Sequence, residues 1–162
     1  MQRIPLRRVI VDPRRVNNFL DTCAFDPKYS PEHEAAQCIR ALASCGQISL
    51  VIAHSNQKEI DHPNTPAEVK REAAGMIFTI ETTLTAGEVA QKHAIHALLT
   101  GNANPERHAA DATHIFEAGK YIGYFITTDQ RILRKRQELS RLSSATIVTP
   151  SKWLKIFSDT DD

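Results

Sequence analysis

Residues 48–53 read Ile-Ser-Leu-Val-Ile-Ala, a short run that is apolar on both sides of an extended chain. Such a run is typical of a strand buried on both faces, as the strands of a parallel sheet are. Residues 124–127 (YFIT) repeat the pattern, and shorter candidate strands lie at 17–20 and 146–148. Helical spacing of apolar residues predicts helices at 31–44, 86–99, 105–119, 130–142 and 150–157. The alternation predicts an α/β fold, a three-layer α/β/α arrangement with a central parallel sheet of about four to five strands.

The remaining stretches give weaker patterns. Residues 55–60 and 67–79 favour helices, whereas the threonine and isoleucine content of 79–85 favours a strand. The chain divides into a basic N-terminal extension (1–16), one domain (17–157) and an acidic tail (158–162) that we expect to be loose.

The composition is that of an ordinary globular domain. Of 162 residues, 41% are apolar and 24% are charged, and the net charge is +1. A nearly neutral chain does not attract nucleic acid as a whole, so any such binding must come from local charge. No apolar run approaches the roughly 20 residues of a membrane span, and no secretory signal pattern is present, so we expect no membrane association.

The cysteines and the absence of certain motifs indicate the cellular compartment and disfavour some enzyme classes. Cys23, Cys38 and Cys45 form no CxxC pair, which favours a reduced, cytoplasmic protein. Cys38 and Cys45 share a face of the helix predicted at 31–44, and we expect them to be small buried residues. The chain contains no GxGxxG, P-loop or GxSxG motif, which disfavours nucleotide-cofactor enzymes and the common serine hydrolases.

Acidic residues follow the predicted strands. Asp21 comes directly after 17–20, Asp129 follows the strand at 124–127, and Glu59 lies shortly after 48–53. The carboxyl ends of parallel strands meet at one edge of a sheet, where α/β proteins bind their ligands. Each acid also has a simpler interpretation: Asp21 as a turn residue, Asp129 as a helix cap and Glu59 as a surface residue.

A fourth acid, Asp111, lies inside a predicted helix. It shares a stripe with Ile115, Ala118 and Ile122, and this stripe is typical of a core-facing side. A carboxylate there is costly unless it is paired or bound to a cation. If the four acids converge, a divalent cation is the simplest compensation, and oxygen ligands suit Mg²⁺ or Mn²⁺.

Three stretches combine these features: NNFLDT (17–22), HSNQKEI (54–60) and HAADATHIFEAGKYIGYFITTDQRIL (108–133). With a first-strand Asp, an inward Asp on a helix and a strand ending Thr-Thr-Asp, the chain resembles the PIN-domain family from about residue 17 to residue 154. The resemblance implies a three-layer α/β/α fold with a parallel sheet. It also implies a Mg²⁺- or Mn²⁺-dependent nuclease that acts mostly on RNA and leaves a 5′-phosphate and a 3′-hydroxyl.

By this resemblance, the metal-binding and catalytic acids are Asp21, Glu59, Asp111 and Asp129. We expect Asp21 and Asp129 to be direct ligands and Asp111 to be a ligand or to hold a metal-bound water. Glu59 would orient or deprotonate the attacking water.

Hydroxyls and cations near these acids are the expected substrate contacts. The resemblance makes Thr22 and Thr128 polar neighbours of the site. The predicted helix at 130–142 is strongly basic and offers Arg131, Arg134 and Lys135 for phosphate binding. A solvated helix face is the alternative for these cations. The arginines of the N-terminal extension are a second candidate surface.

Two positions depart from the family pattern, namely Cys23, where PIN domains often carry Asn, and Arg131, where many carry a further acid. Three hypotheses follow. The first is a metal-dependent endoribonuclease of PIN type, free-standing or the toxin of a toxin–antitoxin pair with an antitoxin-like partner. The second is a PIN-fold RNA- or protein-binding module with a weak or inactive metal site. The third is a phosphatase with an Asp nucleophile, which the spacing of Asp21 and Asp26 does not favour. The resemblance also implies homodimers.

Overall fold

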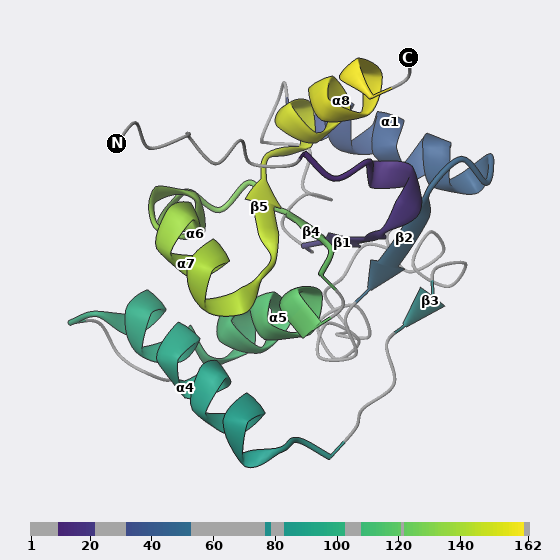
Figure 1. The fold of residues 1–162 in the computed structure, drawn as a ribbon. Helices are drawn as coiled ribbons and strands as arrows, with labels where there is room; N and C mark the ends of the chain where they lie inside the picture. The colour runs from purple at the N-terminus through teal and green to yellow at the C-terminus, as the bar shows by residue number, and fades with distance from the viewer. Residues whose placement is uncertain are drawn as a thin grey trace, which may run out of the picture.

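One parallel sheet organises the computed structural model, which describes residues 10–21, 32–52, 77–78, 83–102, 108–120 and 122–160. Its five strands lie in the order β3-β2-β1-β4-β5 (Figure 1). Their bounds are β1 Asn17–Leu20, β2 Ser49–Ile52, β3 Ile77–Phe78, β4 Tyr124–Ile126 and β5 Thr146–Val148. The strands predicted at 17–20, 48–53, 124–127 and 146–148 are therefore confirmed, and the α/β class with an all-parallel sheet is as expected.

Helices cover both faces of the sheet, an arrangement compatible with the three predicted layers (Figure 1). On one face α1 (Glu32–Ser44) packs against α8 (Pro150–Asp159). On the other lie α4 (Ala86–Thr100), α5 (Ala109–Lys120), α6 (Gln130–Arg134) and α7 (Arg136–Ser143). A short 3₁₀ turn, η1 (Pro13–Arg15), precedes β1 and contacts α8.

Strands β1, β2, β4 and β5 each contribute side chains to both layers because successive residues point to opposite faces. In β1, Phe19 belongs to the core under α4 and α5, whereas Leu20 belongs to the core under α1 and α8. In β4, Phe125 and Ile126 divide in the same way. Burial on both faces is the physical reason that consecutive residues of these strands, Phe19-Leu20 and Phe125-Ile126, are apolar.

Helix ends show how the sequence fixes the element bounds. Thr85 and Glu88 form a reciprocal capping box at the start of α4, and Gly101, with φ 50°, ends that helix. Thr149 caps α8, and Pro150 occupies its first turn. At the end of α5, a Cβ on Gly119 would lie 1.8 Å from the Ser143 carbonyl oxygen, so only glycine allows α5 to approach α7 this closely.

Four sequence expectations are wrong or incomplete in detail. The single helix predicted at 130–142 is two helices, α6 and α7, because Lys135 leaves the helical conformation with φ −105° and ψ 13°. Residues 77–78 form β3 by pairing with β2, so the helix predicted at 67–79 is wrong at these two residues. Of the strand predicted at 79–85 the structure describes residues 83–85, and these form no strand. Thr85 belongs to a helix cap, not to a strand. Helix α8 continues to Asp159, which shortens the expected loose tail.

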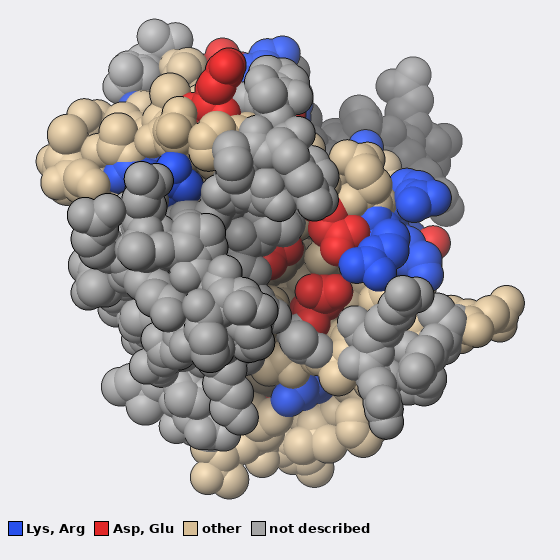
Figure 2. Space-filling model, turned by 180° about the vertical axis from the view of Figure 1, so that it is seen from behind, with Lys and Arg blue, Asp and Glu red and all other residues tan. Residues whose placement is uncertain are grey.

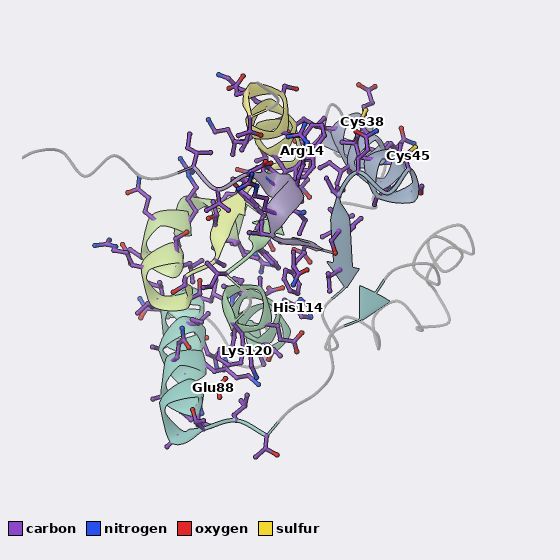
Figure 3. The ribbon with its side chains drawn as sticks, turned by 45° about the vertical axis from the view of Figure 1, so that its right-hand side comes forward. Arg14, Cys38, Cys45, Glu88, His114 and Lys120 are labelled. Carbon is purple, nitrogen blue, oxygen red and sulfur yellow. The ribbon has the colours of Figure 1, made fainter. Side chains whose placement is uncertain are left out.

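Two side-chain expectations also fail. Cys38 and Cys45 are exposed free thiols instead of buried residues, and Figure 3 shows Cys38 on α1 and Cys45 just past its end. Ile122 is 66% exposed because α5 ends at Lys120 and the chain turns through a positive φ of 51° before β4. The predicted short helix at 55–60 lies outside the described residues. Within the described ranges, no helix has the length and apolar character needed to cross a membrane.

Candidate active site at the carboxyl ends of β1 and β4

The strand order reverses at the centre of the sheet. From β1 the chain first builds outward through β2 to β3, and later returns to place β4 and β5 on the other side. Such a switch point opens a crevice at the carboxyl ends of the two central strands, where open α/β sheets bind ligands. Asp21 directly follows β1, and residues 127–129 directly follow β4.

Backbone hydrogen bonds fix both of these strand ends. The Asp21 N–H donates to the Ile126 carbonyl at 2.9 Å, and the Thr127 N–H donates to the Val148 carbonyl at 3.0 Å. The register that pairs Leu20 with Ile126 therefore continues one residue past the strands. The backbones of Asp21 and Thr127 are therefore held in place by hydrogen bonds to neighbouring strands.

Thr127 joins the two acids of the switch point. Its hydroxyl donates to Asp21 Oδ2 at 2.8 Å and accepts a hydrogen bond from the Asp129 N–H at 3.1 Å. Asp21 is 5% exposed and Thr127 is fully buried, so this connection is shielded from water. The structure thus connects the Asp21 carboxylate to the Asp129 backbone through one hydroxyl group. It also assigns the connecting role to Thr127, which the sequence analysis treated only as the end of a strand.

The Asp129 carboxylate accepts three hydrogen bonds from a single residue, Arg131. Its Oδ1 accepts hydrogen bonds from the Arg131 N–H at 2.9 Å and from Nε at 3.3 Å, and its Oδ2 accepts one from Nη2 at 3.0 Å. Asp129 is therefore the N-cap of α6, one of the alternatives open from the sequence. Burial alone would raise the pKa of Asp129, but the hydrogen bonds from Arg131 hold it below its usual value.

Asp111 faces the same region from α5. The pKa of Arg131 is raised by its hydrogen bond to Asp129, and the charge of Asp111 adds to this effect. Asp111 is half-buried in the first turn of α5. The charge of Asp111 therefore acts on the same guanidinium that contacts Asp129. Figure 2 shows acidic side chains gathered at a hollow, with basic side chains directly beside them.

His114 lies one helical turn after Asp111 and is 1% exposed. Figure 3 shows it between α5 and the side of the sheet formed by β2 and β3. Neither of its ring nitrogens has a hydrogen-bond partner among the described residues. An unpaired buried N–H costs about 1–3 kcal/mol, so His114 is an unusual residue to find beneath an acidic site.

The three cations predicted to bind phosphate each have a different hydrogen-bond partner in the structure. Arg131 contacts Asp129, as described above. The Arg134 Nε donates to the Gln130 carbonyl at 3.2 Å, within its own helix. The Lys135 Nζ donates to the Leu98 carbonyl at 2.6 Å and so ties the junction of α6 and α7 to the end of α4. A substrate role for Arg134 and Lys135 stays a prediction.

The fit of a divalent cation can be judged from the donor set. Asp21, Asp111 and Asp129 supply only carboxylate oxygens, the ligands that Mg²⁺ and Mn²⁺ prefer, and Mg²⁺ commonly uses just one or two protein carboxylates with water. Among the residues that the structure describes, no three His, Cys, Asp or Glu side chains form a ready-made metal cluster. Glu59 and Thr22 lie outside those residues. The described donors fit a cation held by Asp21 and Asp129 rather than a closed cage.

Comparisons with models of known protein families, with curated proteins and with solved structures give no match for this chain. Its function must therefore be inferred from the site.

Proposed function

We propose that this protein is a PIN-like endoribonuclease that hydrolyses RNA phosphodiester bonds with Mg²⁺ or Mn²⁺. The observation that carries the proposal is the link from Asp21 through the Thr127 hydroxyl to the Asp129 backbone, at the switch point between β1 and β4. It supplies two carboxylates on fixed strand ends at the edge of the sheet where a ligand is expected. The parallel sheet and the position of Asp111 on the helix before β4 are consistent with the family resemblance of the sequence.

The residues would divide the work as follows. Asp21 and Asp129 would hold the cation, and Asp111 would add a ligand or hold a water on it. When bound, such a cation lowers the pKa of a water, orients the phosphate and stabilises charge on its oxygens. The Thr127 hydroxyl keeps Asp21 in one orientation, because its hydrogen is committed to Oδ2. Glu59 is proposed to orient or deprotonate the attacking water.

Two measurements on wild type and on Asp111→Asn test this proposal. We expect wild type to bind Mn²⁺ in a calorimetric titration and to cleave single-stranded RNA with Mn²⁺ but not with EDTA. Asp111→Asn should weaken metal binding at least about tenfold, a typical loss for a group that supports a metal site. Asp159→Asn, which removes the same charge from the end of α8, should leave both unchanged. Metal-independent cleavage, or Mn²⁺ binding that is equal in all three proteins, would contradict the proposal.

One observation favours a second candidate, a PIN-fold module that binds RNA or protein through a weak or inactive metal site. The Arg131 guanidinium already neutralises Asp129, with an Nη2–Oδ2 distance of 3.0 Å. A cation approaching Asp129 must compete with this partner. The Arg131 side chain is 53% exposed, so it has room to leave. The two candidates thus differ in how strongly Arg131 opposes the metal.

Arg131→Gln should tighten Mn²⁺ binding about three- to tenfold, because it removes a positive charge that directly contacts a metal ligand. Arg134→Gln removes the same charge from the same helix without touching Asp129, so it should change the affinity much less. The measurement is a Mn²⁺ titration of the two variants and wild type. If only Arg131→Gln binds metal, the binding module becomes the better description of the natural chain. Equal affinities in all three proteins would remove the observation that favours it.

A further inference from the structure

A second surface lies along the open edge of the sheet. A groove of about 980 Å³ runs beside β5, between α6 and α7 on one side and α8 on the other. We call it the β5 groove. Ile147 and Val148 lie along it, and Gln130 lines one end. Since Gln130 directly follows Asp129, the groove begins next to the proposed active site.

The charge of the β5 groove has one sign. Arg136, Arg141 and Lys152 line it, whereas none of the described lining residues is an Asp or Glu. In a chain whose acidic and basic residues nearly balance, this is a local positive surface. An anionic occupant would find three cations and no opposing carboxylate in the lining.

Two of these cationic groups differ from most other described ones because their side chains have no partner among the residues that the structure describes. Arg14 contacts Asp12, Lys120 contacts Glu88 across α4 and α5 (Figure 3), and Arg131 contacts Asp129. The Arg141 guanidinium and the Lys152 ammonium, in contrast, make no hydrogen bond or ion pair with another residue that the structure describes. Within the described part of the chain, a ligand can contact these two groups without breaking an internal side-chain contact.

The neutral lining indicates what kind of anion would fit. Gln137, Ser140, Ser144 and Thr149 offer amide and hydroxyl groups that can bond phosphate or sugar oxygens. Among the described lining residues the one aromatic side chain, Tyr124, is 2% exposed and donates its hydroxyl hydrogen to the Val11 carbonyl. Base stacking has no platform here, so recognition would be of the backbone and largely independent of sequence.

We propose that the β5 groove binds the phosphate backbone of single-stranded RNA as the strand extends from the active site, an inference that rests on the proposed nuclease function. Arg141 and Lys152 are the main phosphate contacts and Arg136 is a third. The basic N-terminal segment 1–9 has the same sign of charge as the groove and is not the expected occupant. Continuity with Asp129 through Gln130 favours the substrate over a separate partner.

The test is RNA binding measured by fluorescence anisotropy, with a labelled oligouridine of about a dozen nucleotides, a length within or near single-domain site sizes. EDTA is present throughout, so that binding is measured without cleavage. The double variant Arg141→Gln/Lys152→Gln is compared with Lys92→Gln/Lys155→Gln, which removes the same charge from residues that do not line the groove. Because a lost contact with single-stranded nucleic acid lowers the salt slope by about 0.7, the groove variant should lose about 1.4 from the slope of log affinity against log salt. The control should keep the wild-type slope.

Each outcome decides a separate question. Equal slopes and affinities in the two double variants would overturn the groove assignment, as would an absence of RNA binding by wild type. Binding of an oligoglutamate peptide in place of RNA, lost only in the groove variant, would also overturn it and assign the groove to an acidic protein partner. Groove-dependent RNA binding without Mn²⁺-dependent cleavage would support the groove and contradict the nuclease. If wild type cleaves RNA with Mn²⁺ but the groove variant binds RNA as wild type does, the nuclease function is supported and the groove assignment is contradicted.

Discussion

Asp21→Asn is expected to reduce metal-dependent RNA cleavage by about 10²–10³-fold, the scale on which single electrostatic groups act in active sites. Asn keeps the shape of the side chain and an oxygen that can accept from Thr127, but it loses the charge that would hold a cation. The carboxylate is 5% exposed, and a buried charge is costly before any cation arrives. The metal-free variant should therefore melt no lower than wild type. Cleavage rates with Mn²⁺ and thermal melting in EDTA measure the two effects.

The control for this prediction is Thr127→Val, which removes the hydroxyl that orients Asp21 and keeps the charge. It should lower cleavage less than Asp21→Asn, because a metal can still recruit a less well-positioned carboxylate. Full activity of Asp21→Asn would exclude Asp21 from the reaction and would contradict the proposed site. A large loss of melting temperature in that variant would instead assign Asp21 a structural role.

Trp153→Ala should give the largest loss of stability, about 3–5 kcal/mol, as expected when a fully buried tryptophan is truncated. Trp153 is 0% exposed and stacks on Phe157 with ring centroids 5.3 Å apart. Its Nε1 donates to Asn18 Oδ1 at 2.8 Å, and Asn18 is itself buried in β1. The side chain thus connects α8 to the central strand. Urea unfolding followed by circular dichroism gives the free energy of unfolding.

Trp153→Phe separates the contribution of packing to stability from that of the hydrogen bond to Asn18. It retains an aromatic ring in the core but leaves Asn18 Oδ1 without its indole donor, so a loss of about 1–3 kcal/mol is expected. The remaining Asn18 contacts, from Nδ2 to the Pro13 and Ser49 carbonyls, would stay. If Trp153→Ala cost no more than Trp153→Phe, the packing contribution argued from burial would be wrong.

The strands that the sequence predicted share one property, burial on both faces. In β1, β2, β4 and β5, consecutive apolar residues contribute to the cores on opposite faces of the sheet, and such apolar pairs can be recognised in the sequence. Strand β3 was not predicted in this way. It is two residues long and exists through its pairing with Val51 and Ile52. The break at Lys135 is equally hard to foresee, because it accompanies a contact with Leu98 on another helix.

The candidate site, like the fold, could be predicted only in part from the sequence. Asp21 and Asp129 could be found because acids directly after buried strands meet at one edge of a parallel sheet. Thr127 could not, since its role depends on a hydrogen bond to a residue 106 positions away. Arg131 was expected to contact phosphate, and the structure pairs it with Asp129, two residues before it. The N-cap role of Asp129 was among the alternatives open from the sequence, whereas the contact of the Arg131 guanidinium with the Asp129 carboxylate was not.

The central position of β1 has a consequence for biosynthesis. β1 is the first strand to be made, yet one of its two neighbours, β4, is among the last. The hydrogen bond between Thr127 and Asp21 closes a loop of 106 residues, which takes about 5–20 s to synthesise at typical translation rates. A nascent chain that stops before β4 carries Asp21 without its partner. Most of the domain has therefore been synthesised before this site can form.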